Sequence, residues 1–489
     1  MTLTDRIARG LKATLIARSL HIVANAALLI ALTRYLLTPA EYGQLYFALS
    51  VVGVAVLAGT LGLPMATARY VTEYVENSET QVPHLLEQSL GVVVLLASLI
   101  GLALVLLRNL IAGLLGEPGV APFLLVGGGY VTFQSIFIYL KTVFQGFNRV
   151  AWTAVISSIN GVGRVTFAVG FVLMGFGAVG AMAGYVVAFI IAVAVGLTIL
   201  YWKFYRTYER ASRSEPGLLR RVLKYSVPTT ATKASVVLDS KVDTLLLGVL
   251  GGPIAVAFYT LARQIAEVCL VPAQSLGFTI TPTLGEQKAA SQVDQAARLY
   301  ERSLENVLLL YIPAAVGLVL VAEPAIRHIF SDDYIGAAPI VQLFGVLIIT
   351  RAVNKITGHG LDYLGLARIR AIARALTAFA NVGLNILLIP PLGALGAGVA
   401  TVITHTLYTI VNIYYIHREL DLQLGFFIYR FIRIVTVTLL MAGVVILLLP
   451  YVSGIVTLVA TVALGGAIWG TLSVVLGLID PTEVRSFLG

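Results

Sequence analysis

Long apolar runs recur along the whole sequence, and they constrain the fold more than any other feature. An α-helix needs about 20 mostly apolar residues to cross a bilayer. Only 12% of the residues are charged, about half the roughly 25% typical of a soluble domain. We therefore predict an all-α integral membrane protein with fourteen transmembrane helices, at 11–33, 42–64, 86–107, 120–141, 152–174, 178–201, 226–250, 256–282, 303–322, 336–357, 368–389, 394–416, 427–449 and 453–478.

Lysine and arginine are distributed unevenly between the connecting segments. If the N-terminus is cytoplasmic and the spans alternate, 23 of these cations lie in cytoplasmic segments, and 3 (Arg34, Arg108 and Arg327) lie on the opposite side. An excess of cations marks the cytoplasmic loops of membrane proteins. We therefore predict a multi-pass protein of the cytoplasmic membrane with both termini in the cytoplasm. The same distribution explains the net charge of +9 without a nucleic-acid partner.

An internal repeat relates two halves of the chain. Pro39 aligns with Pro253 at an offset of 214, and Gly177-Ala-Val-Gly-Ala aligns with Gly393-Ala-Leu-Gly-Ala at an offset of 216. Six spans in each half give a parallel repeat, with its pseudo-two-fold axis along the membrane normal. The predicted organisation is an N-terminal lobe at 1–201 (helices 1–6), a cytoplasmic linker at 202–225, a C-terminal lobe at 226–416 (helices 7–12), and helices 13–14 with a cytoplasmic tail at 417–489.

Four spans place polar residues on one helical face, at spacings of three or four residues. These faces are Thr14, Arg18, His21 and Asn25; Thr153, Ser157, Asn160 and Arg164; Thr232, Ser235, Asp239 and Asp243; and Arg370, Arg374, Thr377, Asn381 and Asn385. The repeat aligns Asn160 with Thr377 and Arg164 with Asn381. Because a charge at the bilayer centre costs on the order of 3 kcal/mol, we expect the four faces to line one polar cleft.

Several of the intramembrane charges also have simpler interpretations. Arg263 and Glu267 are four residues apart and could pair with each other. Lys241 lies on a different face from Asp239, and Arg351 could lie at the membrane interface. No metal site or cofactor is expected, because Cys269 is the single cysteine, the 6 histidines show no metal-ligand spacing, and nucleotide-binding motifs are absent.

Five short segments give the sequence its family resemblance. They are Leu32-Thr-Arg-Tyr-Leu-Leu-Thr-Pro-Ala-Glu-Tyr-Gly43, Leu61-Gly-Leu-Pro64, Val242-Asp-Thr-Leu-Leu-Leu-Gly248, Ala257-Phe-Tyr259 and Gly393-Ala-Leu-Gly-Ala397. With them the sequence resembles the polysaccharide flippases, or lipid-linked oligosaccharide translocases, of the multidrug/oligosaccharidyl-lipid/polysaccharide exporter superfamily. The resemblance covers essentially the whole chain. Ala257 replaces the glycine expected before the aromatic residue.

The resemblance implies a translocator without enzymatic activity. Its substrate would be an oligosaccharide on a polyprenyl or dolichyl (pyro)phosphate, flipped by alternating access for cell-surface polysaccharide or glycoprotein glycan assembly. Membrane lipids, and glycosyltransferases or a polymerase of the same pathway, are the candidate partners. A surplus of intramembrane cations fits a phosphate, which arginine binds with its two-pronged guanidinium.

Each polar residue of the predicted cleft has a candidate role. The candidate substrate-binding residues are Arg18, His21, Asn25, Asn160, Arg164, Lys233, Arg263, Arg374, Asn381 and Asn385. Asp239, Asp243 and Glu267 would either balance charge or carry a coupling ion. The alternatives are a cation-coupled multidrug antiporter of the same superfamily, which should carry acids in the first six spans, and a membrane glycosyltransferase, which should have a large external loop. Acids do not dominate the first six spans, where Glu87 at the start of 86–107 is the only one, and the largest expected external loop, at about 323–335, is short.

Overall fold

The computed structural model describes residues 22–273, 293–422 and 424–479, and within these ranges the chain is helical and has no β-strand. Ten helical stretches there are long and apolar enough to cross a membrane, and one of them, 150–207, joins two helices. The prediction of an all-α, multi-pass membrane protein is confirmed. The count of fourteen spans stays a prediction, because parts of two expected spans, 11–21 and 274–282, lie outside the described residues.

The chain forms two compact units, Met1–Ala257 (unit 1) and Phe258–Gly489 (unit 2). Unit 1 contains the helical segment Ile22–Leu36, α2 (Pro39–Thr60), α3 (Leu63–Asn77), α4 (Val82–Leu106), α5 (Arg108–Leu114), α6 (Ala121–Gly146), α7 (Val150–Phe171), α8 (Gly177–Lys203) and α9 (Leu218–Leu250). The boundary falls inside α10 (Gly252–Cys269). Unit 2 continues with α12 (Val293–Ala325), α13 (Ala338–Tyr363), α14 (Ala367–Leu392), α15 (Ala394–Leu420), α16 (Leu424–Leu448) and α17 (Ile455–Val475).

The start of α2 shows how local sequence sets a helix boundary. The Thr38 hydroxyl accepts a hydrogen bond from the Glu41 backbone N–H, and the Glu41 carboxylate accepts one from the Thr38 backbone N–H. This reciprocal arrangement satisfies amide groups that the first turn leaves open. Pro39 occupies the first turn, where its missing N–H is not needed.

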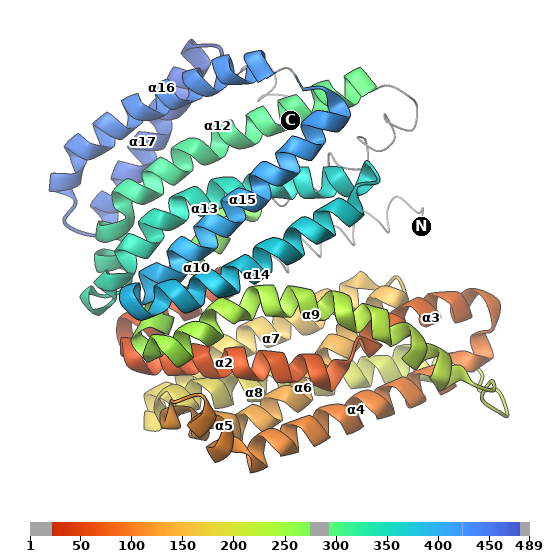
Figure 1. Ribbon diagram of the computed structural model, residues 1–489. Helices are drawn as coiled ribbons and strands as arrows, with labels where there is room; N and C mark the ends of the chain where they lie inside the picture. Colours follow the sequence, from red (N-terminus) through yellow and green to blue (C-terminus); the bar gives the residue numbers. More distant parts are fainter. Residues whose placement is uncertain (1–21, 274–292, 423, 480–489) are drawn as a thin grey trace. The chain divides into compact units, whose positions relative to one another are not determined.

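Helix α9 lies along α2, as Figure 1 shows (green beside red). A methyl group on Gly43 would lie 1.8 Å from the Pro253 carbonyl oxygen, and one on Gly248 would lie 2.2 Å from the Phe47 ring. Glycine is therefore required at both positions for this close approach. Leu218 and Val222 of α9 also join the buried core that α3, α4, α6, α7 and α8 form. By contacts α9 thus belongs to unit 1, whereas the predicted lobe boundaries of 201 and 226 stay a prediction.

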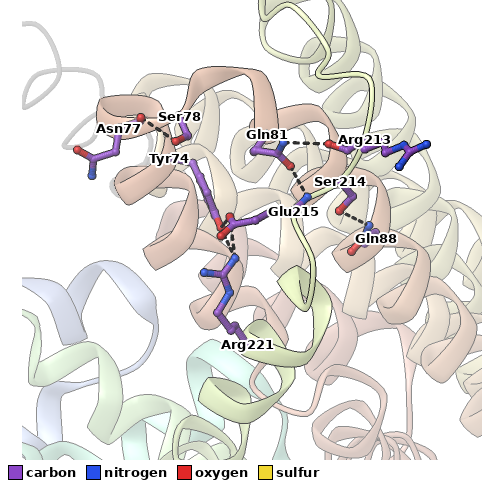
Figure 2. A network of polar contacts seen from close by, with 9 residues as sticks. All are labelled: Tyr74, Asn77, Ser78, Gln81, Gln88, Arg213, Ser214, Glu215 and Arg221. Atoms are coloured by element: carbon purple, nitrogen blue, oxygen red, sulfur yellow. Dashed lines mark hydrogen bonds and ion pairs between the residues drawn. The ribbon is translucent and has the colours of Figure 1, made fainter.

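The segment that leads into α9 is fastened to α3 and α4 (Figure 2). Gln81 donates a hydrogen bond to the Arg213 carbonyl and accepts one from the Glu215 backbone N–H, at 3.0 and 2.9 Å. Gln88 donates to the Ser214 hydroxyl at 2.9 Å, and His84 Nε2 lies 2.9 Å from the Ala211 carbonyl oxygen. The predicted linker is therefore an ordered part of unit 1 in this stretch.

A three-residue cluster of Tyr74, Glu215 and Arg221 completes this fastening (Figure 2). Tyr74 donates to the Glu215 carboxylate at 2.6 Å, and Arg221 pairs with the same carboxylate at 2.7 Å. The hydrogen bonds from Arg221 and Tyr74 hold the pKa of Glu215 below its usual value. Burial, then the hydrogen bond to Glu215, raises the pKa of Tyr74 to about 12. The phenol therefore stays protonated at neutral pH and keeps donating.

Two matching turns precede α8 in unit 1 and α15 in unit 2. Gly177 has φ +56° and ψ −151°, and Gly393 has φ +56° and ψ −132°. Side chains other than hydrogen are strongly disfavoured in this part of φ/ψ space. Three residues later, methyl groups on Gly180 and Gly396 would lie 2.5 Å from the Phe176 Cβ atom and 2.1 Å from the Leu388 carbonyl oxygen. The glycine pattern of the sequence repeat thus corresponds to one turn built twice.

Candidate functional site

Arg164, a partly exposed arginine whose Nε atom is buried, is the centre of the candidate site in unit 1. The guanidinium carbon of Arg164, on α7, lies 4.5 Å from the centroid of the Tyr185 ring on α8. Tyr130 of α6 and Tyr46 of α2 are also within electrostatic reach of this guanidinium. Aromatic rings attract a cation through their electron-rich faces. In the part of the chain that the structure describes, no carboxylate lies within ion-pair distance of Arg164.

Several buried polar atoms on the helices around Arg164 have no hydrogen-bond partner among the described residues. They are Arg164 Nε, Asn160 Nδ2, Gln134 Oε1 and Tyr185 Oη. Asn160 is 4% exposed and Tyr185 is fully buried. We call Gln134, Asn160, Arg164 and Tyr185 the Arg164 cluster. Because buried polar groups in folded proteins are almost always hydrogen-bonded, this cluster is able to bind a polar or anionic ligand.

The predicted residues on α9 occupy different environments. Asp243 is buried at 6% exposure, while Lys233 and Asp239 are exposed. Lys241 reaches α2, where its Cε atom lies 3.2 Å from the position of a methyl group on Gly53. Lys241 therefore faces α2.

In unit 2 the predicted polar residues contact one another. Arg263 Nε lies 3.1 Å from the Glu267 carboxylate, so the expected ion pair within α10 is present. Asn385 donates to the backbone carbonyl and side-chain oxygen of Asn381, both at 2.9 Å, and Asn381 donates to Thr404 of α15 at 3.4 Å. These amides use their hydrogen-bonding capacity inside the protein.

Arg374 extends the polar face of α14 toward α15. Its guanidinium carbon lies 5.1 Å from the centroid of the Tyr408 ring. On the neighbouring helices, Asn354 donates to Thr409 and Asn412 donates to Asn354. Asn354, Thr409 and Asn412 are not among the candidate residues predicted from the sequence, although Asn354 and Asn412 are amides inside expected spans.

The first polar face is only partly visible. Arg18 and His21 lie outside the described residues, and Asn25 lies in the helical segment Ile22–Leu36 and is partly exposed. Among the described residues, no three His, Cys, Asp or Glu side chains are grouped so that they could hold a metal ion. Gln134 and Tyr185 were missed as site residues. Gln134 could have been noticed as a glutamine inside an apolar span. Tyr185 could not, because only packing between α7 and α8 brings its ring to Arg164.

Comparison with known families decides the class of protein. The family model described as "Polysaccharide biosynthesis protein" matches residues 9–287, more than half of the chain. The chain belongs to this family. A second family model, MatE, matches residues 228–390. Membership of the polysaccharide biosynthesis family confirms the resemblance found in the sequence.

Two curated relatives of this family member come from Haloferax volcanii. The probable low-salt glycan biosynthesis flippase Agl15 is 23% identical over 415 residues, which cover 83% of this chain and 82% of the relative. The probable flippase AglR is 24% identical over 317 residues, which cover 62% of this chain and 65% of the relative. Both relatives carry a flippase name, and neither is named as an enzyme.

Solved structures share the fold. The lipid II flippase MurJ in an inward closed conformation superposes with a TM-score of 0.73 at 17% identity, covering 96% of this chain and 98% of that one. An inward-facing multidrug resistance transporter of the MATE family gives a TM-score of 0.64 at 15% identity, covering 82% and 94%. The family member therefore has the fold that flippases and multidrug transporters of this superfamily share.

Proposed function

We propose that the protein flips an oligosaccharide linked to a polyprenyl or dolichyl (pyro)phosphate across the cytoplasmic membrane by alternating access. The observation that carries the proposal is the position of Arg164 against a tyrosine ring, with its Nε atom buried and no carboxylate at ion-pair distance in the described chain. A cation in a lipid-embedded bundle marks a substrate pathway. Guanidinium groups bind phosphate oxygens through paired N–H donors. Family membership and the flippase names of the relatives support the same function.

The structure refines the roles that we propose for individual residues. Arg164 binds phosphate, with Arg18 and Lys233 as further predicted contacts. Asn160 and Asn25 bind sugar hydroxyls. Arg263 is already paired with Glu267, which favours charge balance as the role of Glu267.

The remaining proposed roles belong to α14 and α9. Asn385 donates hydrogen bonds to Asn381, and Asn381 donates one to Thr404; these bonds favour a structural role for both amides. Arg374, which lies over the Tyr408 ring, keeps its predicted substrate contact. Asp239 and Asp243 keep their predicted role in coupling or charge balance.

The orientation and partners complete the proposal. Both termini face the cytoplasm, as the cation distribution predicts, and the protein performs no covalent chemistry. Its partners are the glycolipid substrate, the surrounding lipids and glycosyltransferases or a polymerase of the same pathway. The orientation is tested by labelling from outside in a Cys269-free background. A cysteine at position 332 should react and one at position 212 should not, and the opposite pattern would overturn the orientation.

The alternative function is that of a multidrug antiporter, which the MatE match and the MATE-like fold support. A cation exporter needs carboxylates where its substrate binds. Helices α6, α7 and α8 contain no aspartate or glutamate, and their partly buried ionic groups, Lys141 and Arg164, are cations. This charge pattern favours an anionic substrate.

The proposal is tested by transport in proteoliposomes with a fluorescent lipid-linked oligosaccharide. Arg164→Gln should lower the flipping rate by about 10- to 100-fold, since hydrogen bonds to charged groups contribute about 1.5–3 kcal/mol. Arg149→Gln, at the exposed start of the same helix, is the matched control and should transport normally. Normal transport by Arg164→Gln, or export of a lipophilic cation in place of the glycolipid, would refute the proposal.

A further inference from the structure

The Arg164 cluster presents hydrogen-bonding atoms of both kinds, and a phosphate alone cannot satisfy them. Arg164 Nε and Asn160 Nδ2 are donors, Gln134 Oε1 is an acceptor, and Tyr185 Oη is both. An ionised phosphate diester offers acceptors only, so it leaves Gln134 Oε1 without a partner. A hydroxyl group donates one hydrogen bond and accepts two. The mixture of donors and acceptors therefore matches a hydroxyl-rich ligand next to an anion.

Packing between α6, α7 and α8 sets the positions of these residues along the bundle. The rings of Tyr130 and Phe137, which flank Gln134 on α6, both have centroids 5.3 Å from that of Phe189 on α8. Gln134 is therefore level with Phe189, about one helical turn from Tyr185.

Asn160 lies on the same side of Tyr185 as Gln134. A methyl group on Gly163 would lie 3.1 Å from the Ala188 Cβ atom, and one on Gly196 would lie 3.5 Å from the Ile156 side chain. Because Gly163 and Ile156 flank Asn160, this residue lies opposite the middle of the stretch 188–196 of α8, about two helical turns from Tyr185. Asn160 is also one turn from Arg164 on the same face of α7.

These buried polar groups either bind a ligand or destabilise the folded protein. A buried donor or acceptor without a partner destabilises the folded state by roughly 1–3 kcal/mol, and four such atoms occur on adjoining faces. Arg164 and Gln134 are each partly exposed as whole side chains. Rotation of these two side chains therefore opens the cluster to a ligand, and rotamer changes of this kind are common on binding.

We infer that the Arg164 cluster is the binding site for the first sugar of the glycolipid, the one attached directly to the phosphate. Gln134, Asn160 and Tyr185 bind its hydroxyls, while Arg164 binds the adjacent phosphate. The inference rests on the proposed flippase function and adds Gln134 and Tyr185 as residues that discriminate a glycosylated carrier from a bare one. Bare carrier lipid lacks the hydroxyls, so it leaves the amide and phenol groups unsatisfied and binds less well.

The test measures binding of two probes to the full-length protein in phosphatidylcholine nanodiscs by native mass spectrometry. The probes are a polyprenyl monophosphate and the same lipid carrying one hexose. Wild type should bind the glycosylated probe at least about 10-fold more tightly, since each hydrogen bond contributes a factor of about 3 to 10. Gln134→Leu and Tyr185→Phe should each reduce this ratio by about 3- to 10-fold, with the Kd for the bare lipid unchanged.

Tyr139→Phe is the matched control. The Tyr139 hydroxyl is buried on α6, the helix that carries Gln134, but it already has a hydrogen-bond partner in Ser89 at 2.8 Å. It should leave the binding ratio unchanged and lower the Tm. Without ligand, Gln134→Leu and Tyr185→Phe should leave the Tm unchanged or raise it, because they remove unsatisfied atoms. A Tm loss equal to that of Tyr139→Phe would mean that internal water already satisfies the cluster, and it would overturn the inference.

The failures of the two proposals are distinguishable. Arg164→Gln should weaken both probes by a similar factor of about 10 or more. If it weakens neither while Gln134→Leu and Tyr185→Phe still reduce the ratio, the phosphate role of Arg164 is wrong and the sugar contacts stand. A wild-type ratio of one, or a ratio unchanged in both variants, would overturn the sugar site and leave the flippase function to the transport assay.

Discussion

Helices α7 and α8 of unit 1 and α14 and α15 of unit 2 are corresponding pairs in the sequence repeat, yet their polar chemistry differs. Arg164 lies over the Tyr185 ring in the first pair. At the aligned position of the second pair, Asn381 donates to Thr404. The first arrangement leaves buried polar atoms without partners, and the second is an internal hydrogen bond. On our proposal, the first copy of the repeated pair binds the ligand, whereas the second has a structural role.

Substitution of the two aligned residues, Arg164 and Asn381, should give the largest difference in stability between the two helix pairs. Asn381→Arg places a charge beside Thr404 with no carboxylate designed for it, and an uncompensated buried charge costs about 3–5 kcal/mol. Arg164→Asn removes a charge without leaving a paired acid behind, so it should cost only about 1 kcal/mol of cation–π attraction. Thermal unfolding of both variants in nanodiscs measures the difference. Equal Tm losses would show that the two environments are alike.

The sequence predicted the apolar spans well because their signal is local. It missed α3 and α5, which are too polar or too short to be recognised as spans, and it started α9 at residue 226 although the helix begins at Leu218. The Asn160–Arg164 spacing identified a polar face from one helix alone. The identity of the rings around Arg164 depends on packing between helices, and this information is absent from the periodicity of any single span.

The polar residues of unit 2 show the same limit of sequence periodicity. Asn381 and Asn385 are four residues apart, and this spacing correctly indicated that they share a face. The spacing alone did not show that the two amides bond to each other. It also could not show that Thr404 of the neighbouring helix accepts from Asn381. Sequence periodicity thus located polar faces, whereas the partners of each side chain determine whether a face is open to a ligand.

Gly180 and Gly396, the glycines that follow the two matching turns, test whether the two units share the same scaffold. Gly396→Ala meets a backbone carbonyl at 2.1 Å, and Gly180→Ala meets the Phe176 Cβ atom at 2.5 Å. Overpacking of this kind costs about 1–3 kcal/mol, and Gly396→Ala should lie at the upper end because the backbone cannot yield. Gly170→Ala and Gly383→Ala, which meet nothing within 4 Å, are the controls, and neither should destabilise its helix. Neutral Gly180 and Gly396 variants would contradict the tight contacts.

The two turn glycines should behave alike. Gly177 and Gly393 share φ +56°, so alanine at either position imposes backbone strain of about 1–2 kcal/mol. We expect Tm losses that agree within error for the two variants, measured under the same lipid conditions. A loss at only one of them would show that the repeated turns are not equivalent in energy.

The smallest expected effect concerns the fastening of the linker in unit 1, which depends on the ionised Glu215 carboxylate. Its pKa is lowered by hydrogen bonds from Arg221 and Tyr74, so its contribution is complete above the unfolded glutamate pKa of about 4.3 and is lost as the pH falls through the lower folded value. Because Glu215 and Arg221 are 41% and 43% exposed, the contribution should stay below about 1 kcal/mol.

Glu215→Gln should therefore lower the Tm slightly at pH 7 and converge with wild type as the pH falls through the lowered pKa of Glu215, because the carboxylate is then protonated. Glu323→Gln in unit 2 is the control, since its partner Arg327 is four residues away and the two side chains are 58% and 50% exposed, which predicts little change at pH 7. A Tm difference between Glu215→Gln and wild type that grows as the pH falls would reverse the sign and refute the role of the carboxylate. Loss of the difference at high salt would instead support it, because salt screens exposed pairs.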